Sequence, residues 1–241
     1  VSWNIVGEIP GKNPDKLVMV GCHVDGHDIS QGAQDPASGT VAVIEAARVL
    51  AKYAGQLDCT VRFAIWGVEE IGLLGSRQYV QDHKAEMPNV RFYLNMDGAG
   101  AATNKDIVLN EWAELAALFK NWQAEMAVDY KVGQSVHAFS DHFPFLMVGV
   151  PTGGMQSATQ STGGRGYGHT RYDTLDKVNI RSLREAAVLG ARWLLRLATV
   201  AGWPVQHRTE AEVAALFEGP EYEEDAKYRA EIAAFYAEKR A

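Results

Sequence analysis

Leu17-Val18-Met19-Val20-Gly21-Cys22 is an almost continuous apolar run, and it decides the fold class of this chain. A strand with one face in water alternates apolar and polar residues, whereas an unbroken run is typical of a strand buried on both faces. Further runs of this kind lie at 60–66 and 90–96, and shorter strands are predicted at 3–9 and 107–109. Strands buried on both faces need helices on both sides of their sheet, so the sequence predicts an α/β protein.

Between these runs, apolar residues recur at the spacing of an α-helix. Helices are predicted at residues 40–53, 73–83, 111–126 and 181–200. In the first of them, Val41, Ile44 and Ala47 form a stripe that we expect to face the core. Residues 152–168 are rich in Gly, Ser and Thr and are predicted to form a loop. Strands that alternate with helices predict a sandwich built around a mostly parallel sheet.

The chain has 241 residues, enough for one large domain, and its composition changes near the end. We assign residues 1–202 to the main domain. Residues 203–241 are predicted to form a helical extension packed on that domain, because 221–240 are rich in Glu, Lys, Ala and Tyr. Within the extension, Thr209 and Glu212 have the spacing of a capping box, which marks the start of a helix.

Charge and hydropathy exclude several kinds of partner. A net charge of −7 argues against nucleic acid, and no apolar run approaches the roughly 20 residues that span a bilayer. No signal-peptide pattern opens the chain; if it is a processed fragment, a secreted or periplasmic location is favoured. Cys22 and Cys59 are expected to be buried free thiols, with a disulfide as the alternative. Assembly into a homo-oligomer is left open.

Polar side chains follow each of the three long predicted strands. His23 and Asp25 follow 17–22, the adjacent pair Glu69-Glu70 follows 60–66, and Asp97 follows 90–96. In parallel sheets the carboxyl ends of neighbouring strands share one edge, where ligands bind. We therefore expect these side chains to lie together.

Each of these residues also has an ordinary structural explanation. His23-Val24-Asp25 occurs by chance in many sequences, although residues two apart on an extended segment point the same way. Asp35 precedes a predicted helix and could be its N-cap, or its two oxygens could bridge two cations. The Asp35–Pro36 bond could be cis at modest cost, which would re-aim the carboxylate. Asp97 could instead lie in a turn or cap a helix, and His169 could simply be exposed to solvent.

The Glu69-Glu70 pair is harder to explain as surface, because it interrupts an apolar and glycine-rich stretch. One carboxylate can bind metal while its neighbour acts as a general base. Two histidines, three carboxylates and a spare glutamate are a sensible inventory for two Zn²⁺ ions, with other divalent metals as alternatives. The sequence has no H-E-x-x-H helix, no G-x-S-x-G elbow and no phosphate-binding P-loop.

At these positions the sequence resembles the co-catalytic two-zinc aminopeptidase family. This family includes bacterial leucyl aminopeptidases, carboxypeptidase Q and glutamate carboxypeptidase II. The resemblance runs in order from residue 3 to about residue 200. It rests on motifs at 21–25, 31–35, 69–76, 95–97, 140–142 and 169–170.

The resemblance implies a ligand set for two zinc ions. His23 and Glu70 would be terminal ligands of different ions. Asp97 and His169 would complete the terminal ligands, and Asp35 would bridge the two ions.

It also implies roles for residues around the ions. Glu69 would be the general base, and Asp25 would orient His23 from behind. Asp141 would support the site without binding metal, and Tyr167 lies near a position where some members stabilise an oxyanion. Rim or structural roles are expected for two further histidines, His27 and His142.

The implied fold is a three-layer α/β/α sandwich with a mixed, mostly parallel central sheet. Residues 1–202 would then be a zinc peptidase catalytic domain that hydrolyses the N-terminal bond of a peptide or dipeptide. One alternative is a dipeptidase or carboxypeptidase of the same family. Another is a catalytically inactive binding domain of this fold.

Overall fold

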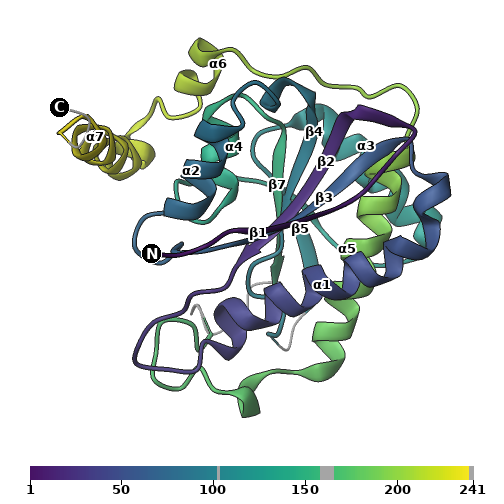
Figure 1. Ribbon diagram of the computed structural model, residues 1–241, viewed down its shortest axis with the longest axis horizontal. Helices are drawn as coiled ribbons and strands as arrows, with labels where there is room; N and C mark the ends of the chain where they lie inside the picture. The colour runs from purple at the N-terminus through teal and green to yellow at the C-terminus, as the bar shows by residue number, and fades with distance from the viewer. Residues whose placement is uncertain (102–103, 158–165, 239–241) are drawn as a thin grey trace.

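A mixed β-sheet forms the centre of the protein in the computed structural model, which describes residues 1–101, 104–157 and 166–238 (Figure 1). The sheet of these described residues has seven strands in the order β1-β3-β2-β4-β7-β5-β6. The strands are β1 (Ile5–Ile9), β2 (Asn13–His23), β3 (Cys59–Trp66), β4 (Val90–Asn95), β5 (Lys105–Leu109), β6 (Val132–Gln134) and β7 (Thr152–Ser157). Neighbours pair in parallel except β1 with β3 and β5 with β7. The predicted mixed, mostly parallel sheet is confirmed.

Helices cover both faces of this sheet, as the buried strands require. They are α1 (Gly39–Leu50), α2 (Leu74–Asp82), α3 (Ala113–Met126), α4 (His142–Met147), α5 (Ile180–Thr199), α6 (Glu210–Ala215) and α7 (Glu223–Glu238). Short 3-10 or π-helical turns are η1 (Ala33–Ser38), η2 (Ala51–Gln56), η3 (Met87–Asn89), η4 (Leu175–Lys177) and η5 (Pro220–Tyr222). One core cluster joins the sheet to α1, α3 and α5, and a second joins it to α2 and α4 (Figure 1).

The pairing of β2 places the polar residues at one edge. β2 lies between β3 and β4 and is parallel to both, with His23 beside Trp66 and Gly21 beside Asn95. The carboxyl ends of the three strands therefore meet, as the sequence predicts. The buried side chains of β2 anchor this edge in the core, because Val18 and Val20 pack toward α1 and α5 while Met19 packs toward α2 and α4.

Helix α1 forms where predicted, but its buried face differs from the expected stripe. Val41 and Ile44 are 50% and 56% exposed, and the side chains in the core are those of Ala42, Val43 and Ala46. Apolar residues lie on both sides of this helix, so the pattern alone did not distinguish them. The close packing of α1 against α5 and the sheet selects the side with the smaller residues.

The prediction of a loop over 152–168 is wrong in its first part. Thr152–Ser157 is strand β7, which pairs with β4 on one side and with β5 on the other. Its sequence, TGGMQS, has one β-branched residue, Thr152, and no aromatic residue, so it is unlike a typical strand. Pairing on both sides therefore imposes the extended conformation. Residues 158–165 of the predicted loop lie outside the described residues.

Two smaller predictions agree with the structure. Cys22 and Cys59 are buried free thiols. Thr209 and Glu212 form the capping box at the start of α6, with the Thr209 hydroxyl accepting from the Glu212 N–H and the Glu212 carboxylate accepting from the Thr209 N–H.

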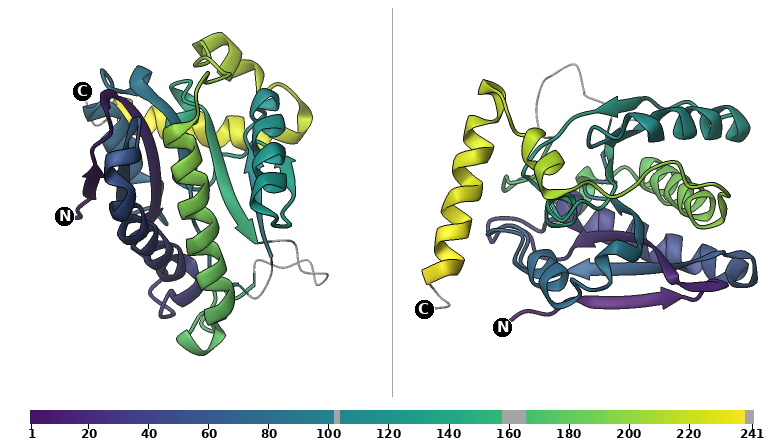
Figure 2. Two further views of the ribbon diagram at one scale, coloured as in Figure 1. Left: turned by 90° about the vertical axis from the view of Figure 1, so that its right-hand side faces the viewer. Right: turned by 90° about the horizontal axis from the view of Figure 1, so that it is seen from above.

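After residue 202, α6 packs against the main domain and α7 lies at the periphery, as the views of Figure 2 show. Val213 and Phe217 share a buried cluster with Phe143 and Leu146 of α4. Tyr228 of α7 approaches Phe139, with 6.3 Å between ring centres. Among the described residues, each helix is too short or too polar to cross a membrane.

Candidate metal centre

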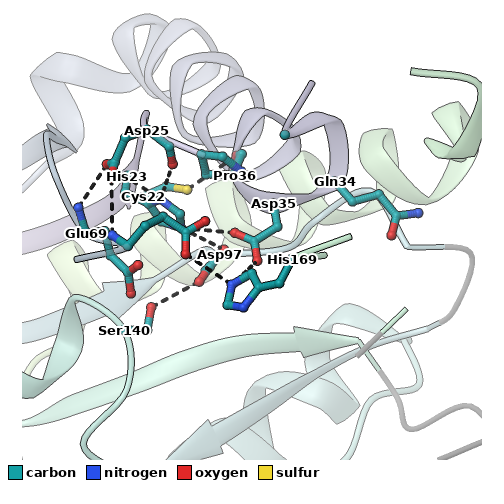
Figure 3. Close-up of polar contacts among 12 residues, drawn as sticks. Cys22, His23, Asp25, Gln34, Asp35, Pro36, Glu69, Asp97, Ser140 and His169 are labelled. Carbon is teal, nitrogen blue, oxygen red and sulfur yellow. Dashed lines mark hydrogen bonds and ion pairs between the residues drawn. The ribbon is translucent and has the colours of Figure 1, made fainter. Parts of the chain in front are cut away.

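His23 and Asp97 lie at the ends of two core strands, and we call them the strand half-site (Figure 3). His23 is the last residue of β2 and Asp97 follows β4. The His23 Nε2 atom lies 3.4 Å from Asp97 Oδ1 and 3.2 Å from Oδ1 of Asp35. The His23 ring is only 1% exposed, so the strand half-site is held inside the protein.

Opposite charges compensate for burial in the strand half-site. Burial opposes a charged His23, but the nearby carboxylates of Asp97 and Asp35 outweigh it and raise the pKa of His23 well above its ordinary value. Burial likewise favours a neutral Asp97, and His23 together with the Ser140 hydroxyl outweighs it and lowers the pKa of Asp97. The half-site is thus built to hold a positive charge between carboxylates.

Glu70 and His169 come from loops, and we call them the loop half-site. His169 Nε2 lies 3.1 Å from Glu70 Oε2 and 3.2 Å from Asp35 Oδ2. The His169 side chain is 36% exposed, and its backbone has a φ of 60°. The preceding Gly168 lets the loop approach closely, because a Cβ there would lie 3.0 Å from Asp35 Oδ2. Burial, and then the charge of Asp35, raises the pKa of Glu70.

Asp35 lies between the two half-sites and directs one oxygen at each. It is extended within η1, with φ −123° and ψ 101°, and its bond to Pro36 is cis. Asp35 is not a helix N-cap, because η1 begins after Gly32 and α1 begins after Ser38. The buried carboxylate of Asp173 accepts hydrogen bonds from two backbone N–H groups, that of Gln34 at 2.6 Å and that of Asp35 at 3.0 Å. The sequence suggested no role for Asp173, which follows His169 by four residues.

Asp25 supports the site through different atoms than expected. Its carboxylate accepts the backbone N–H groups of Glu69, at 2.9 Å, and Glu70, at 3.1 Å. The His23 Nδ1 atom lies 2.8 Å from the Asp25 carbonyl oxygen but 3.9 Å from its carboxylate. The resemblance implies that Asp25 orients His23, and a carboxylate is a common partner for the second ring nitrogen of a ligand histidine. Instead the backbone does so, and the carboxylate holds the two adjacent glutamates in place.

Ser140 and Asn95 are supporting residues that the sequence did not identify. The Ser140 hydroxyl donates to Asp97 Oδ2 at 3.1 Å and accepts from the Asn95 side-chain amide at 2.7 Å. Both residues belong to motifs that carried the family resemblance. Because neither is a metal ligand or an acid, only the contacts of Ser140 and Asn95 reveal their roles.

The remaining predicted site residues lie around the centre. Asp141 is completely buried beside the start of α4, and burial raises its pKa to about 7. His142, the next residue, is also buried. Tyr167 is 42% exposed and lies under the Lys177 ammonium, 5.7 Å from the ring centre. It does not line the cavity formed by the described residues.

Both half-sites open into one cavity of about 730 Å³. Glu69 also lines this cavity, and Figure 3 shows its carboxylate on the same side as Asp97 and Ser140. Burial, with the repulsion of Asp141 and Asp97, raises the pKa of Glu69 to about 8. A basic carboxylate therefore lies beside the grouped imidazoles and acids.

The donor atoms fit divalent cations. Asp35 Oδ1 and Glu70 Oε1 are buried yet accept no aligned hydrogen bond from any described residue. Buried polar atoms without a partner are costly, and a cation would satisfy them. Ligands about 2.0–2.1 Å from a tetrahedral zinc lie about 3.3 Å from one another. The imidazole-to-carboxylate distances of the two half-sites are 3.1 to 3.4 Å.

The model of peptidase family M28 matches residues 4–193, and the chain belongs to this family. The resemblance inferred from the sequence motifs is therefore confirmed. The match covers all seven strands of the described sheet and both half-sites.

Similar proteins include leupeptin-inactivating enzyme 1 of Streptomyces exfoliatus, 31% identical over 82% of this chain and 49% of that protein. Leucine aminopeptidase 2 of Trichophyton rubrum is 30% identical over 64% of this chain and 33% of that protein. A zinc aminopeptidase from Bacillus subtilis has a similar structure, with a TM-score of 0.71, 27% identity, and coverage of 84% of this chain and 51% of that one. This chain spans a third to a half of the length of these proteins.

Proposed function

We propose that the protein is a zinc-dependent aminopeptidase that removes the N-terminal residue of a peptide or dipeptide. The observation that carries this proposal is the pairing of Glu69 with Glu70 at one cavity. Glu70 lies among the cation donors of the loop half-site, while Glu69 lines the cavity with a raised pKa. A binding domain has no need of a basic carboxylate beside its ions.

The two half-sites would hold one zinc ion each, with Asp35 shared between them. Bound zinc would polarise the scissile carbonyl and lower the pKa of water toward about 7. Glu69 would accept the proton of the attacking water and pass it to the leaving amine, so it ends the cycle as it began.

Asp25 would keep Glu69 and Glu70 in these separate roles. Its carboxylate accepts hydrogen bonds from the backbone N–H groups of both glutamates, which fixes the backbone from which the two side chains project. Asp173 would do the same for Asp35, whose backbone N–H donates a hydrogen bond to the Asp173 carboxylate. The named activities of similar proteins, leucine aminopeptidase and zinc aminopeptidase, favour the amino end of the substrate.

The test is hydrolysis by the purified chain of a leucyl dipeptide with both termini free, its N-acetylated form and its C-amidated form, with and without zinc. We expect zinc-dependent cleavage of both substrates with a free amine and none of the acetylated one. Cleavage that requires a free carboxylate would indicate a carboxypeptidase. Tight zinc binding without cleavage of any of them would favour a binding domain.

A further inference from the structure

His27 turns its ring into the metal centre, although the sequence suggested a rim or structural role. It lies four residues after His23, in the segment that leaves β2, and it lines the cavity. Its ring centre is 4.3 Å from that of His169, and its Nε2 atom is 2.9 Å from Glu70 Oε2. His27 is therefore a second imidazole at the loop half-site and a third at the whole metal centre.

Among the described residues, no aligned hydrogen bond explains the position of the His27 Nε2 atom, although Glu70 Oε2 lies within ion-pair distance. The side chain is 39% exposed, yet Nε2 itself is buried and makes no aligned hydrogen bond with the described residues. Glu70 Oε2 is close enough for a hydrogen bond but lies in the wrong direction for one. An imidazole that only rested on the rim would direct its nitrogen at water.

Donor atoms of His27, Glu70 and His169 lie within 4.8 Å of one another. Asp35 Oδ2, 3.2 Å from His169 Nε2, adds a fourth donor atom. Two imidazoles and two carboxylates are a full tetrahedral set for zinc, whose ligand atoms lie about 3.3 Å apart. The strand half-site has a single imidazole, His23, with Asp97 and Asp35.

We propose that His27 is a fourth protein ligand of the ion held by Glu70, His169 and Asp35. This rests on the proposed function, which places a zinc ion in each half-site. The loop half-site is then closed by protein ligands, while the strand half-site keeps an open position. Closed sites are typical of tightly held zinc, and catalytic sites keep a position for water or substrate.

The two ions consequently differ in affinity and in metal preference. The loop half-site fills first and favours zinc, because imidazole ligands suit zinc better than magnesium or manganese. The strand half-site, richer in oxygen than nitrogen, fills second and exchanges more readily with manganese.

The test compares wild type, His27→Ala and His27→Gln, with His83→Ala as the matched control. His83 is a half-buried histidine stacked on Tyr79, away from the centre. Zinc affinity is measured by chelator competition, and the imidazoles around zinc are counted by X-ray absorption at the zinc edge. Circular dichroism and thermal melting of the metal-free proteins establish that each variant folds.

We expect wild type to show three imidazoles over two zinc ions and His27→Ala to show two. In His27→Ala, the affinity of the tighter zinc site should fall by more than roughly 10- to 100-fold. A loss of that size is expected when only a hydrogen-bond partner of a metal ligand is removed. Added imidazole should restore part of that affinity. His27→Gln, which keeps an N–H group but cannot replace the ring, should behave like His27→Ala, and His83→Ala like wild type.

Two results would overturn the proposal, and only the second would also overturn the proposed function. If His27→Ala keeps the wild-type imidazole count, His27 is not a ligand, while two bound zinc ions would leave the proposed function in place. If wild type binds no zinc, both proposals fail together.

Discussion

The two half-sites share Asp35 but are built differently. His23 and Asp97 are attached to buried strands, and the His23 ring is 1% exposed. Glu70 and His169 are attached to loops, and the His169 side chain is 36% exposed. Side chains at strand ends are positioned by the sheet itself, whereas those on loops are positioned by contacts with other loops. One half of the centre is therefore held by the core, and the other by long-range contacts between loops.

Substitution of Asp35 should have the largest effect, because it removes what the half-sites share. In Asp35→Ala, we expect both zinc ions to be lost and aminopeptidase activity to fall to background. Zinc content by mass spectrometry and steady-state rates measure this. One zinc retained at full affinity would show that the half-sites are independent and that Asp35 is not a bridge.

Glu69→Gln should separate catalysis from metal binding. General acid–base catalysis contributes about 10²- to 10⁴-fold, so kcat should fall by that factor. Both zinc ions should remain, because Glu69 is not among the donors of either half-site. Near-normal kcat in this variant would show that another group takes the proton.

Asp173→Asn tests whether the two half-sites depend on the support of Asp35. The amide has one acceptor oxygen where the carboxylate has two, so one of the N–H groups of Gln34 and Asp35 loses its partner. Loss of such support costs about 10- to 100-fold in metal affinity, and we expect both ions to be affected. Asp176→Asn, an exposed neighbour, is the control. An effect on a single ion would show that Asp173 supports only one half-site.

The smallest effect concerns the stability of the metal-free protein. The pKa of Glu69 is raised to about 8 in the folded chain from about 4.5. The folded state therefore binds more protons, and this contribution to stability is full below pH 4.5 and lost as pH rises to about 8. Relative to Glu69→Gln, wild type should lose stability as pH rises from 5 to 8.5, with an upper bound of about 1.4 kcal/mol for each unit of the pKa shift. Urea denaturation of both proteins measures the difference, and parallel pH profiles would contradict it.

Much of the fold could be predicted from the sequence, because buried strands have an unmistakable composition. The runs at 17–22, 60–66 and 90–96 became β2, β3 and β4, neighbours at the centre of the sheet. Strand β7 could not be predicted, because its residues favour turns and only its pairing keeps it extended. The buried face of α1 was also misassigned, because packing against α5 and not periodicity chose it.

The gathering of acids and a histidine at one edge of the sheet follows from the sequence alone, because these residues follow parallel strands whose ends coincide. The contacts that orient these side chains depend on how distant segments of the chain pack together. Asp173 reaches Gln34 across 139 residues, and the carboxylate of Asp25 reaches Glu69 across 44. The orientation of the His27 ring likewise could not be predicted from the sequence. A hydrogen bond or a metal ligand needs atoms placed to within a few tenths of an ångström, and between distant loops only the packed chain sets that distance.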